Sequence, residues 1–327
     1  MIDAPYWAPA QCEGFLLDWD GVIAETKLDF SGLREKYFGG RRAMLLEEGA
    51  LLPPELRGQY MKELQEIEMA GAERAVPVPG ALELIAWLRK HKVPYCILSR
   101  NSMEVIRRGA ETIGFELPEL TWGRDNAPFV KPDPAALRAA ATALGAAPEK
   151  CAYVGDFIYD LQGARRSAMR AILVQHEGTE WLNWADVSYP KLTELVEALV
   201  DPKPLVPWEY REISLKKGER WLTAAAELCF SLPSDPSPTS DCWLLRAASL
   251  GVGTFCVEGD KIFTPEDWKK NQSFDISLMG RSWAEAVRSL FAERYPLVRV
   301  TEEADNAMVA PKNSLDIMRF IERKKLF

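Results

Sequence analysis

The chain has 327 residues, of which 47% are apolar and 27% are charged, so it has the composition of a folded globular protein of about two domains. A net charge of −8 disfavours nucleic acid as a partner, because such a surface repels phosphates. No apolar run is as long as a membrane span, and the start shows no secretory pattern. We therefore expect a cytoplasmic protein that binds neither nucleic acid nor a membrane.

The chain has six Cys and two His, and no two Cys form a C-x-x-C pair. This disfavours a zinc cluster and leaves few groups for histidine-based catalysis. Cysteines without an evident pairing also fit a reducing compartment. If the protein is an enzyme, its chemistry should depend on carboxylates.

Up to residue 200, short apolar runs alternate with helical patterns. The apolar runs predict strands over residues 15–17, 95–98, 151–154 and 171–174. The helical patterns predict helices over residues 80–90, 102–113, 134–144, 160–168 and 191–199. Strands that alternate with helices predict an α/β fold, a doubly wound parallel sheet with helices on both faces. Ligands of such sheets bind beyond the carboxyl ends of the strands.

Residues 27–78 interrupt this alternation, because they contain helical patterns and no strand. Leu56, Tyr60 and Leu64 recur there at helical spacing. The insertion is either a plain surface hairpin or a lid. A lid is suggested by its position, since the insertion begins directly after an acidic loop.

A Pro-rich stretch at residues 201–208 predicts a linker. Beyond it we expect a second α/β domain, with strands over residues 227–232, 252–257, 275–278 and 297–300. Its helices are expected over residues 221–226, 241–250 and 314–324, and from a capping box at Ser282 to about residue 295. The predicted domains are a core of residues 1–26 and 79–201, a helical insertion of residues 27–78, and a C-terminal domain of residues 202–327.

The first predicted strand runs directly into the acidic loop Asp18-Trp19-Asp20-Gly21. A carboxylate at the end of a buried strand is costly unless it meets a cation or takes part in chemistry. Two acids in one turn need not be redundant, because one can act as a nucleophile while the other transfers protons.

Two later segments carry groups suited to phosphate. The second strand ends in Ser99-Arg100-Asn101-Ser102, where a hydroxyl beside the free amides of a helix start predicts a phosphate site. Asn101 with Glu104 would equally fit a helix cap. Lys131, just before Pro132-Asp133-Pro134, is either a surface lysine or a cation that neutralises a phosphate.

A further acidic segment, Gly155-Asp156 with Asp160, follows the strand predicted over residues 151–154. If these acids meet Asp18 in one crevice, they repel each other unless a divalent cation lies between them. Oxygen ligands of this kind suit Mg²⁺, which keeps several waters and bridges to phosphate.

Together these segments resemble the four motifs of the haloacid dehalogenase-like (HAD) superfamily, in their order and in their place after strands. The motifs correspond, in order, to Asp18-Trp19-Asp20-Gly21-Val22, Ser99, Lys131, and Asp156 with Asp160. The resemblance covers about residues 12–200 and implies a HAD-like Rossmannoid core.

The resemblance implies a Mg²⁺-dependent attack on phosphorus. Asp18 would be the nucleophile that forms an aspartyl-phosphate, and Asp20 would protonate the leaving oxygen and then activate water. Lys131 would balance the charge of the nucleophile and the phosphate. The phosphoryl oxygens would be bound by Ser99 and the Arg100 amide, and Mg²⁺ by Asp18, the Asp20 backbone carbonyl, Asp156 and Asp160.

Asp20 also separates subclasses, because dehalogenases of the superfamily need no acid two residues after the nucleophile, whereas its phosphatases and phosphomutases carry one. The insertion at residues 27–78 matches the family's small helical cap and implies a small, diffusible phosphate ester. Residues 29–80 and 99–101 resemble phosphoglycolate-phosphatase-like members. Four cations of the insertion could meet an anionic substrate or form a solvated face: Arg34, Lys36, Arg41 and Arg42.

Two alternatives to a phosphatase of small phosphorylated metabolites stay open. A phosphomutase would use the same residues and return the phosphoryl group to a sugar. A scaffold or bifunctional protein would have its main role in the C-terminal domain, where residues 227–257 resemble the donor-side segment of GT-B glycosyltransferases. Arg246 departs from that pattern, which has an acid there. As an accessory domain, residues 202–327 would instead pair two copies of the chain or support the cap.

Overall fold

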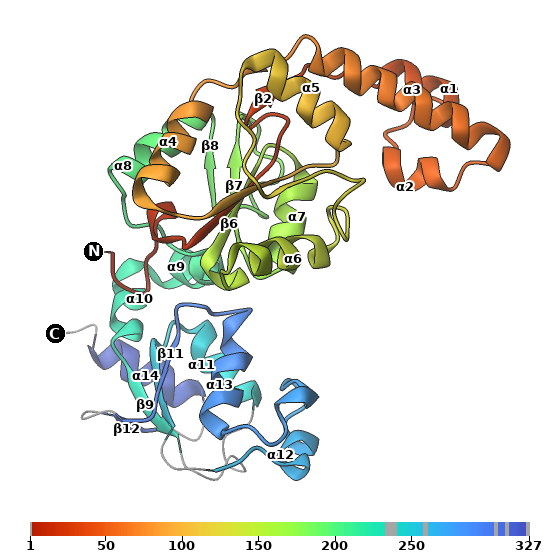
Figure 1. The fold of residues 1–327 in the computed structure, drawn as a ribbon. Coiled ribbons are helices and arrows are strands. Elements are labelled where there is room, and N and C mark those ends of the chain that lie inside the picture. The colour runs from red at the N-terminus through yellow and green to blue at the C-terminus, as the bar shows by residue number, and fades with distance from the viewer. Residues whose placement is uncertain (1, 233–240, 258–260, 304–306, 311–313, 325–327) are drawn as a thin grey trace. The chain divides into compact units, whose positions relative to one another are not determined.

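The computed structural model describes residues 2–232, 241–257, 261–303, 307–310 and 314–324 (Figure 1). The chain divides into two compact units, one of Cys12–Asp201 and one of Met1–Gln11 with Pro202–Phe327. We refer to them as the core unit and the C-terminal unit. Among the helices described, none is long and apolar enough to cross a membrane.

The core unit is built on a six-stranded parallel sheet in the order β5-β4-β1-β6-β7-β8. Its strands are β1 (Gly14–Leu17), β4 (Tyr95–Leu98), β5 (Thr121–Trp122), β6 (Cys151–Gly155), β7 (Arg170–Val174) and β8 (Val187–Tyr189). The sequence predicted β1, β4, β6 and β7, which are apolar and almost fully buried. The edge strands β5 and β8 are too short to give a readable pattern.

Helices lie on both faces of this sheet, which confirms the predicted fold class (Figure 1). They are α4 (Ala81–His91), α5 (Met103–Ile113), α6 (Pro134–Leu144), α7 (Ile158–Arg166) and α8 (Leu192–Val200). The pair α6 and α7 packs on one face, and the pair α4 and α8 on the other. Helix α6 begins at Pro134 because the Asp133 carboxylate accepts a hydrogen bond from the Ala135 amide at 2.9 Å. Helix α7 begins two residues earlier than predicted, so Asp160 lies in its first turn.

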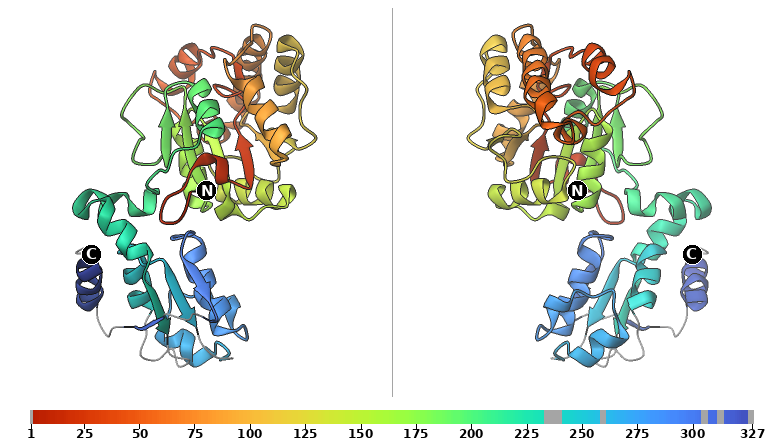
Figure 2. Two further views of the ribbon diagram at one scale, coloured as in Figure 1. Left: turned by 90° about the vertical axis from the view of Figure 1, so that its left-hand side faces the viewer. Right: turned by 90° about the vertical axis from the view of Figure 1, so that its right-hand side faces the viewer.

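Residues 27–78, which we call the cap, form a group of three helices connected to the core by the short strands β2 (Ala24–Glu25) and β3 (Val76–Pro77). The cap helices are α1 (Ser31–Phe38), α2 (Leu45–Ala50) and α3 (Pro54–Ala72). Tyr60 of α3 joins them, because its ring packs edge-on against Tyr37 and Phe38 and its hydroxyl donates to the Leu45 carbonyl at 2.8 Å. The side views show the cap helices together near one end of the core sheet (Figure 2).

The C-terminal unit contains a second parallel sheet, of four strands in the order β11-β10-β9-β12. Its strands are β9 (Cys229–Leu232), β10 (Thr254–Val257), β11 (Arg299–Thr301) and β12 (Met308–Val309). Its helices are α9 (Arg211–Lys217), α10 (Glu219–Ala226), α11 (Asp241–Ser249), α12 (Pro265–Lys270), α13 (Trp283–Ala292) and α14 (Ser314–Lys324). The predicted second α/β domain is therefore present. Residues 233–240 of the glycosyltransferase-like segment lie outside the described residues.

Two sequence predictions differ from the structure in this unit. The predicted strand at residues 275–278 is wrong, because Ile276–Leu278 form a short 3-10 helix. The 3-10 helix has a local cause, because the Asp275 carboxylate accepts a hydrogen bond from the Ser277 amide at 2.8 Å and closes a turn. Residues 1–11 pack with the C-terminal unit and not with the core, because Trp7 and Leu205 exchange backbone hydrogen bonds of 3.1 and 2.8 Å.

Candidate active site

Three neighbouring strands of the core sheet end at one place. Because β1 lies between β4 and β6, the residues that follow their carboxyl ends are brought together: Asp18, Ser99 and Asp156. All three line a cavity of about 840 Å³, whose other walls come largely from the cap. The structure thus brings together residues that are far apart in the sequence.

Asp18, directly after β1, lies at this cavity. Its Oδ1 atom is 2.8 Å from the Lys131 Nζ atom and accepts a hydrogen bond from the Trp19 amide at 2.7 Å. Burial raises the pKa of the Asp18 carboxyl to about 7, against the lowering effect of the Lys131 charge. The Asp18 carboxylate therefore needs nearby positive charge to stay ionised.

Lys131 is a buried cation and not a surface residue, since only 1% of its surface is exposed. Its Nζ atom contacts Asp18 Oδ1 and Asp160 Oδ1, both at 2.8 Å, and the Tyr153 hydroxyl at 2.5 Å. Tyr153 in turn donates to the Leu98 carbonyl at 2.7 Å. Burial lowers the pKa of the Lys131 ammonium, but the charges of Asp160 and Asp18 outweigh it and leave the pKa above its ordinary value. Lys131 is thus a fixed positive charge beside Asp18.

Asp20 has different partners from Asp18. Its Oδ2 atom accepts a hydrogen bond from Asn101 Nδ2 at 2.7 Å, and its Oδ1 atom accepts one from the Thr26 hydroxyl. Burial raises the pKa of the Asp20 carboxyl above its ordinary value, although both hydrogen bonds lower it. Asp20 is thus oriented at the cavity, and its raised pKa makes its carboxyl easier to protonate than that of an exposed aspartate.

Ser99 and Arg100 follow β4 and line the cavity. Ser99 is buried, lines the cavity, and accepts a hydrogen bond from the Asn101 amide at 3.2 Å. The Arg100 guanidinium forms two hydrogen bonds with Glu47 of the cap, at 2.9 and 2.8 Å. The Arg100 side chain therefore connects the core to α2 of the cap.

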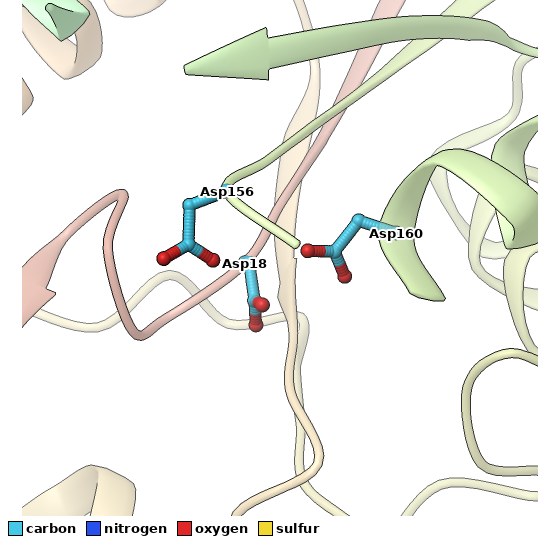
Figure 3. A group of neighbouring side chains, drawn as sticks. All are labelled: Asp18, Asp156 and Asp160. Carbon is cyan, nitrogen blue, oxygen red and sulfur yellow. The ribbon is translucent and has the colours of Figure 1, made fainter. Parts of the chain in front are cut away.

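Asp156 and Asp160 complete the acidic group (Figure 3). Asp18, Asp156 and Asp160 each offer one carboxylate oxygen, and these oxygens lie within 4.8 Å of one another. Burial raises the pKa of Asp156 well above its ordinary value, and the charges of Asp160 and Asp18 add to this. Asp160 has a second role, because its Oδ2 atom accepts a hydrogen bond from the Phe157 amide at 3.1 Å at the start of α7.

These residues fit a divalent cation. Buried carboxylates that repel one another are stable together only when positive charge lies between them, and an all-oxygen set suits Mg²⁺. Gly21 makes the close approach of Asp156 possible, because a Cβ atom at Gly21 would lie 2.1 Å from Asp156 Oδ2. The Asp20 carboxylate lies outside this group of three, so Asp20 could contribute through its backbone only, as the resemblance implies.

Sequence reasoning missed the residues that position the acids. Thr26 and Asn101 orient Asp20, and Tyr153 contacts Lys131. The sequence also fits Asn101 as a helix cap, but α5 is capped by Ser102, whose hydroxyl accepts a hydrogen bond from the Val105 amide at 3.4 Å. Tyr153 lies inside an apolar strand and carries no sequence signal of its contact with Lys131.

The fold and the site together form an α/β unit with a group of carboxylates at a cavity that the cap helps to line. Residues 12–168 match the family model of the haloacid dehalogenase-like hydrolases. This match confirms the resemblance to that family and the prediction of a hydrolase.

The relatives of this chain are phosphatases by name. Hexitol phosphatase A of Escherichia coli (strain K12) is 26% identical over 162 residues, which are 45% of this chain and 75% of that protein. A phosphoglycolate phosphatase of Caulobacter vibrioides is 27% identical over 160 residues, 47% of this chain and 67% of that protein. Among solved structures, a hydrolase from Pseudomonas syringae shares the fold, with a TM-score of 0.50 at 20% identity over 58% of this chain and 99% of that chain.

Proposed function

We propose that the core unit is a Mg²⁺-dependent phosphatase that hydrolyses a small phosphate monoester through an aspartyl-phosphate on Asp18. One observation carries this proposal: Asp18 Oδ1 takes both the Lys131 and the Trp19 contacts, which leaves Oδ2 without a hydrogen bond from the described residues. A carboxylate with one oxygen fixed and the other free is arranged for in-line attack. The names of the related phosphatases support the same reaction.

In the first step, Asp18 Oδ2 attacks phosphorus, and the bond from phosphorus to the leaving oxygen breaks. Lys131 remains beside Asp18 and offsets the negative charge that the nucleophile and the phosphoryl group bring together. Asp160 and Tyr153 keep the Lys131 ammonium in place. Ser99 would bind a phosphoryl oxygen from the end of β4.

Asp20 would transfer the protons. Asp20 can donate a proton to the leaving alkoxide and then accept one from the water that cleaves the aspartyl-phosphate, and the rise of its pKa through burial favours the first of these transfers. The Thr26 and Asn101 hydrogen bonds fix the orientation that both transfers need. An exposed acid of ordinary pKa would be mostly ionised at neutral pH and a poorer proton donor.

Mg²⁺ would be held by Asp18, Asp156 and the Asp20 backbone carbonyl, with Asp160 as a further or orienting ligand, and when bound it neutralises charge on the transferring phosphoryl group. The cap would contribute by covering the cavity and limiting the access of bulk water.

A phosphate-release assay on the full chain with Mg²⁺ and p-nitrophenyl phosphate tests the proposal. Asp18→Asn should abolish turnover while the circular dichroism spectrum stays unchanged, because the amide is not a nucleophile. The matched control is Asp275→Asn in the C-terminal unit, which should keep full activity, since Asn caps a helix as well as Asp. Equal phosphate release by Asp18→Asn and the parent chain would refute the nucleophile role.

The phosphomutase alternative is resolved by product analysis. A phosphatase releases inorganic phosphate from a sugar phosphate in proportion to the substrate consumed. A mutase converts the same substrate to its positional isomer and releases little phosphate.

A further inference from the structure

The four cations singled out in the cap fall into two pairs in the structure. Arg34 and Arg42 line the cavity, whereas Lys36 and Arg41 do not. Lys36 pairs with Glu63 at 2.6 Å, and Arg41 pairs with Glu48. The positive charge of the second pair is therefore compensated within the cap.

Arg34 and Arg42 are placed on aromatic rings instead. The Arg34 Cζ atom lies 5.8 Å from the centroid of Phe30, and the Arg42 Cζ atom lies 5.4 Å from the centroid of Phe157. Stacking uses the flat face of a guanidinium and leaves its N–H edge available to an acceptor. The Arg34 Nε atom is buried, and no described residue accepts a hydrogen bond from it.

The acids near these two arginines form no ion pair with them among the described residues. Within the part of the chain that the structure describes, no carboxylate lies in ion-pair distance of Arg34 or Arg42. Glu68, another wall residue, is paired with Arg124 at 2.7 Å. The cavity therefore has an acidic end at Asp18 and Asp156, suited to Mg²⁺ and phosphate, and unpaired guanidinium edges on its cap side.

We propose that Arg34 and Arg42 bind a second anionic group on the leaving portion of the substrate, a carboxylate or a phosphate. The substrate class is then a phosphate ester that carries a second negative charge. This inference rests on the proposed function of the same cavity. A volume of about 840 Å³ leaves room for a leaving group of sugar size between the two anions, more than a two-carbon acid fills.

The experiment compares esters of matched size that differ in the second charge. Phosphoglycerate is compared with glycerol phosphate for the carboxylate, and glucose bisphosphate with glucose monophosphate for the phosphate. The wild-type kcat/KM should be roughly 10- to 100-fold higher for the anionic member of at least one pair, as expected for charged hydrogen bonds. The pair that shows the preference identifies which anion is bound.

Arg34→Ala and Arg42→Ala should each reduce this preference by roughly tenfold, mainly through KM, because the second anion is bound before and during the reaction. The neighbouring variants Lys36→Ala and Arg41→Ala are matched controls that remove a cap cation and should keep the wild-type preference. In the wild type, a kcat/KM ratio near one between the two esters of each pair would overturn the proposal. An equal reduction of that ratio in all four variants would also overturn it.

Failure of the subsite and failure of the phosphatase proposal give different results. If p-nitrophenyl phosphate is hydrolysed but neither pair shows a preference, only the subsite is refuted. If no ester is hydrolysed, the phosphatase proposal fails, and the subsite is judged by calorimetric titration of phosphoglycerate and glycerol phosphate. Tighter binding of phosphoglycerate that Arg34→Ala abolishes and Arg41→Ala retains would support it, and equal binding of the two esters would refute it.

Discussion

The core unit and the C-terminal unit both contain a parallel sheet with helices packed around it, but they differ in what their buried positions contain. In the core unit, the buried Lys131 forms ion pairs with two buried acids, Asp18 directly after β1 and Asp160 in α7. In the C-terminal unit, the described interior is dominated by aromatic and aliphatic side chains, among them Phe230, Phe255 and Phe291. Apolar runs alternating with helices therefore predict the sheet, whereas a few polar residues after the strands predict the chemistry.

Replacing Lys131 should give the largest effect, because it removes the charge on which the polar interior of the core unit depends. Lys131→Met leaves Asp18 and Asp160 buried without a cation, which should cost about 3–5 kcal/mol of unfolding free energy. It should also lower kcat by about 10²–10³, the effect of losing one well-placed electrostatic group. Urea unfolding and the phosphate-release assay measure the two effects.

Lys131→Arg separates the effect of the positive charge from the effect of the position of the Lys131 nitrogen. It keeps the positive charge, but a guanidinium cannot occupy a site where one nitrogen contacts three oxygens within 2.5–2.8 Å. We expect stability between those of the wild type and Lys131→Met. If Lys131→Met unfolds at the wild-type urea concentration, the buried ion-pair network does not stabilise the core unit.

Phe255→Ala tests how far the apolar interior stabilises the C-terminal unit. Phe255 of β10 is fully buried and stacks on Phe291 with a centroid distance of 5.0 Å. Its truncation should destabilise the C-terminal unit by about 3–5 kcal/mol through the cavity that it leaves. The described residues that line the cavity all belong to the core unit, so phosphate release at 25 °C should stay unchanged. Parallel loss of activity and stability would show that the core depends on the C-terminal unit.

The comparison also explains which parts of the site were readable in the sequence. Asp18, Ser99 and Asp156 each follow an apolar run, and neighbouring parallel strands must bring such residues together. The strand order that makes β1, β4 and β6 neighbours was not predicted and comes from the structure. Fold and family were therefore predictable from local patterns.

The remaining parts depend on tertiary contacts that no local pattern encodes. Thr26 and Asn101 meet at Asp20 only because the segment that leads into the cap lies beside the residues that follow β4. Arg41 and Arg42 are adjacent in sequence, yet one pairs with Glu48 and the other stacks on Phe157. The misassigned residues 275–278 and the N-terminal residues 1–11 show the same limit, since a single capping Asp and one pair of backbone contacts decide their structure.

Mg²⁺ should stabilise the core unit and leave the C-terminal unit unaffected. Binding at 100 times the dissociation constant stabilises a folded unit by about 2.7 kcal/mol. We expect Mg²⁺ to raise the melting temperature of the core unit, whose unfolding transition is the one that Lys131→Met lowers. The transition of the C-terminal unit, which Phe255→Ala lowers, should not shift. Asp156→Asn should remove the shift, because Asp156 belongs to the group of three acids. A shift that persists in Asp156→Asn would place the ion elsewhere.

The smallest expected effect concerns the ion pair of Glu47 with Arg100, which connects the cap to the core. Burial raises the pKa of Glu47, but the hydrogen bonds and charge of Arg100 outweigh it and leave the pKa below its ordinary value. Because the Glu47 side chain is 39% exposed, solvent screens the pair, and Glu47→Gln should cost only about 0.5–1 kcal/mol at pH 7.

The sign of the pH dependence follows from the lowered pKa of Glu47. Its contribution is fully present above the unfolded-state pKa of about 4.3 and is lost as the pH falls through the lower folded-state value. The stability difference between the wild type and Glu47→Gln, measured by urea unfolding, should therefore be constant from pH 7 to pH 5 and shrink below that. It should also shrink in high salt, since the pair is partly exposed. A difference that persists in acid and in high salt would mean that the Glu47→Gln substitution disturbs packing in the cap and that the charge of Glu47 contributes little.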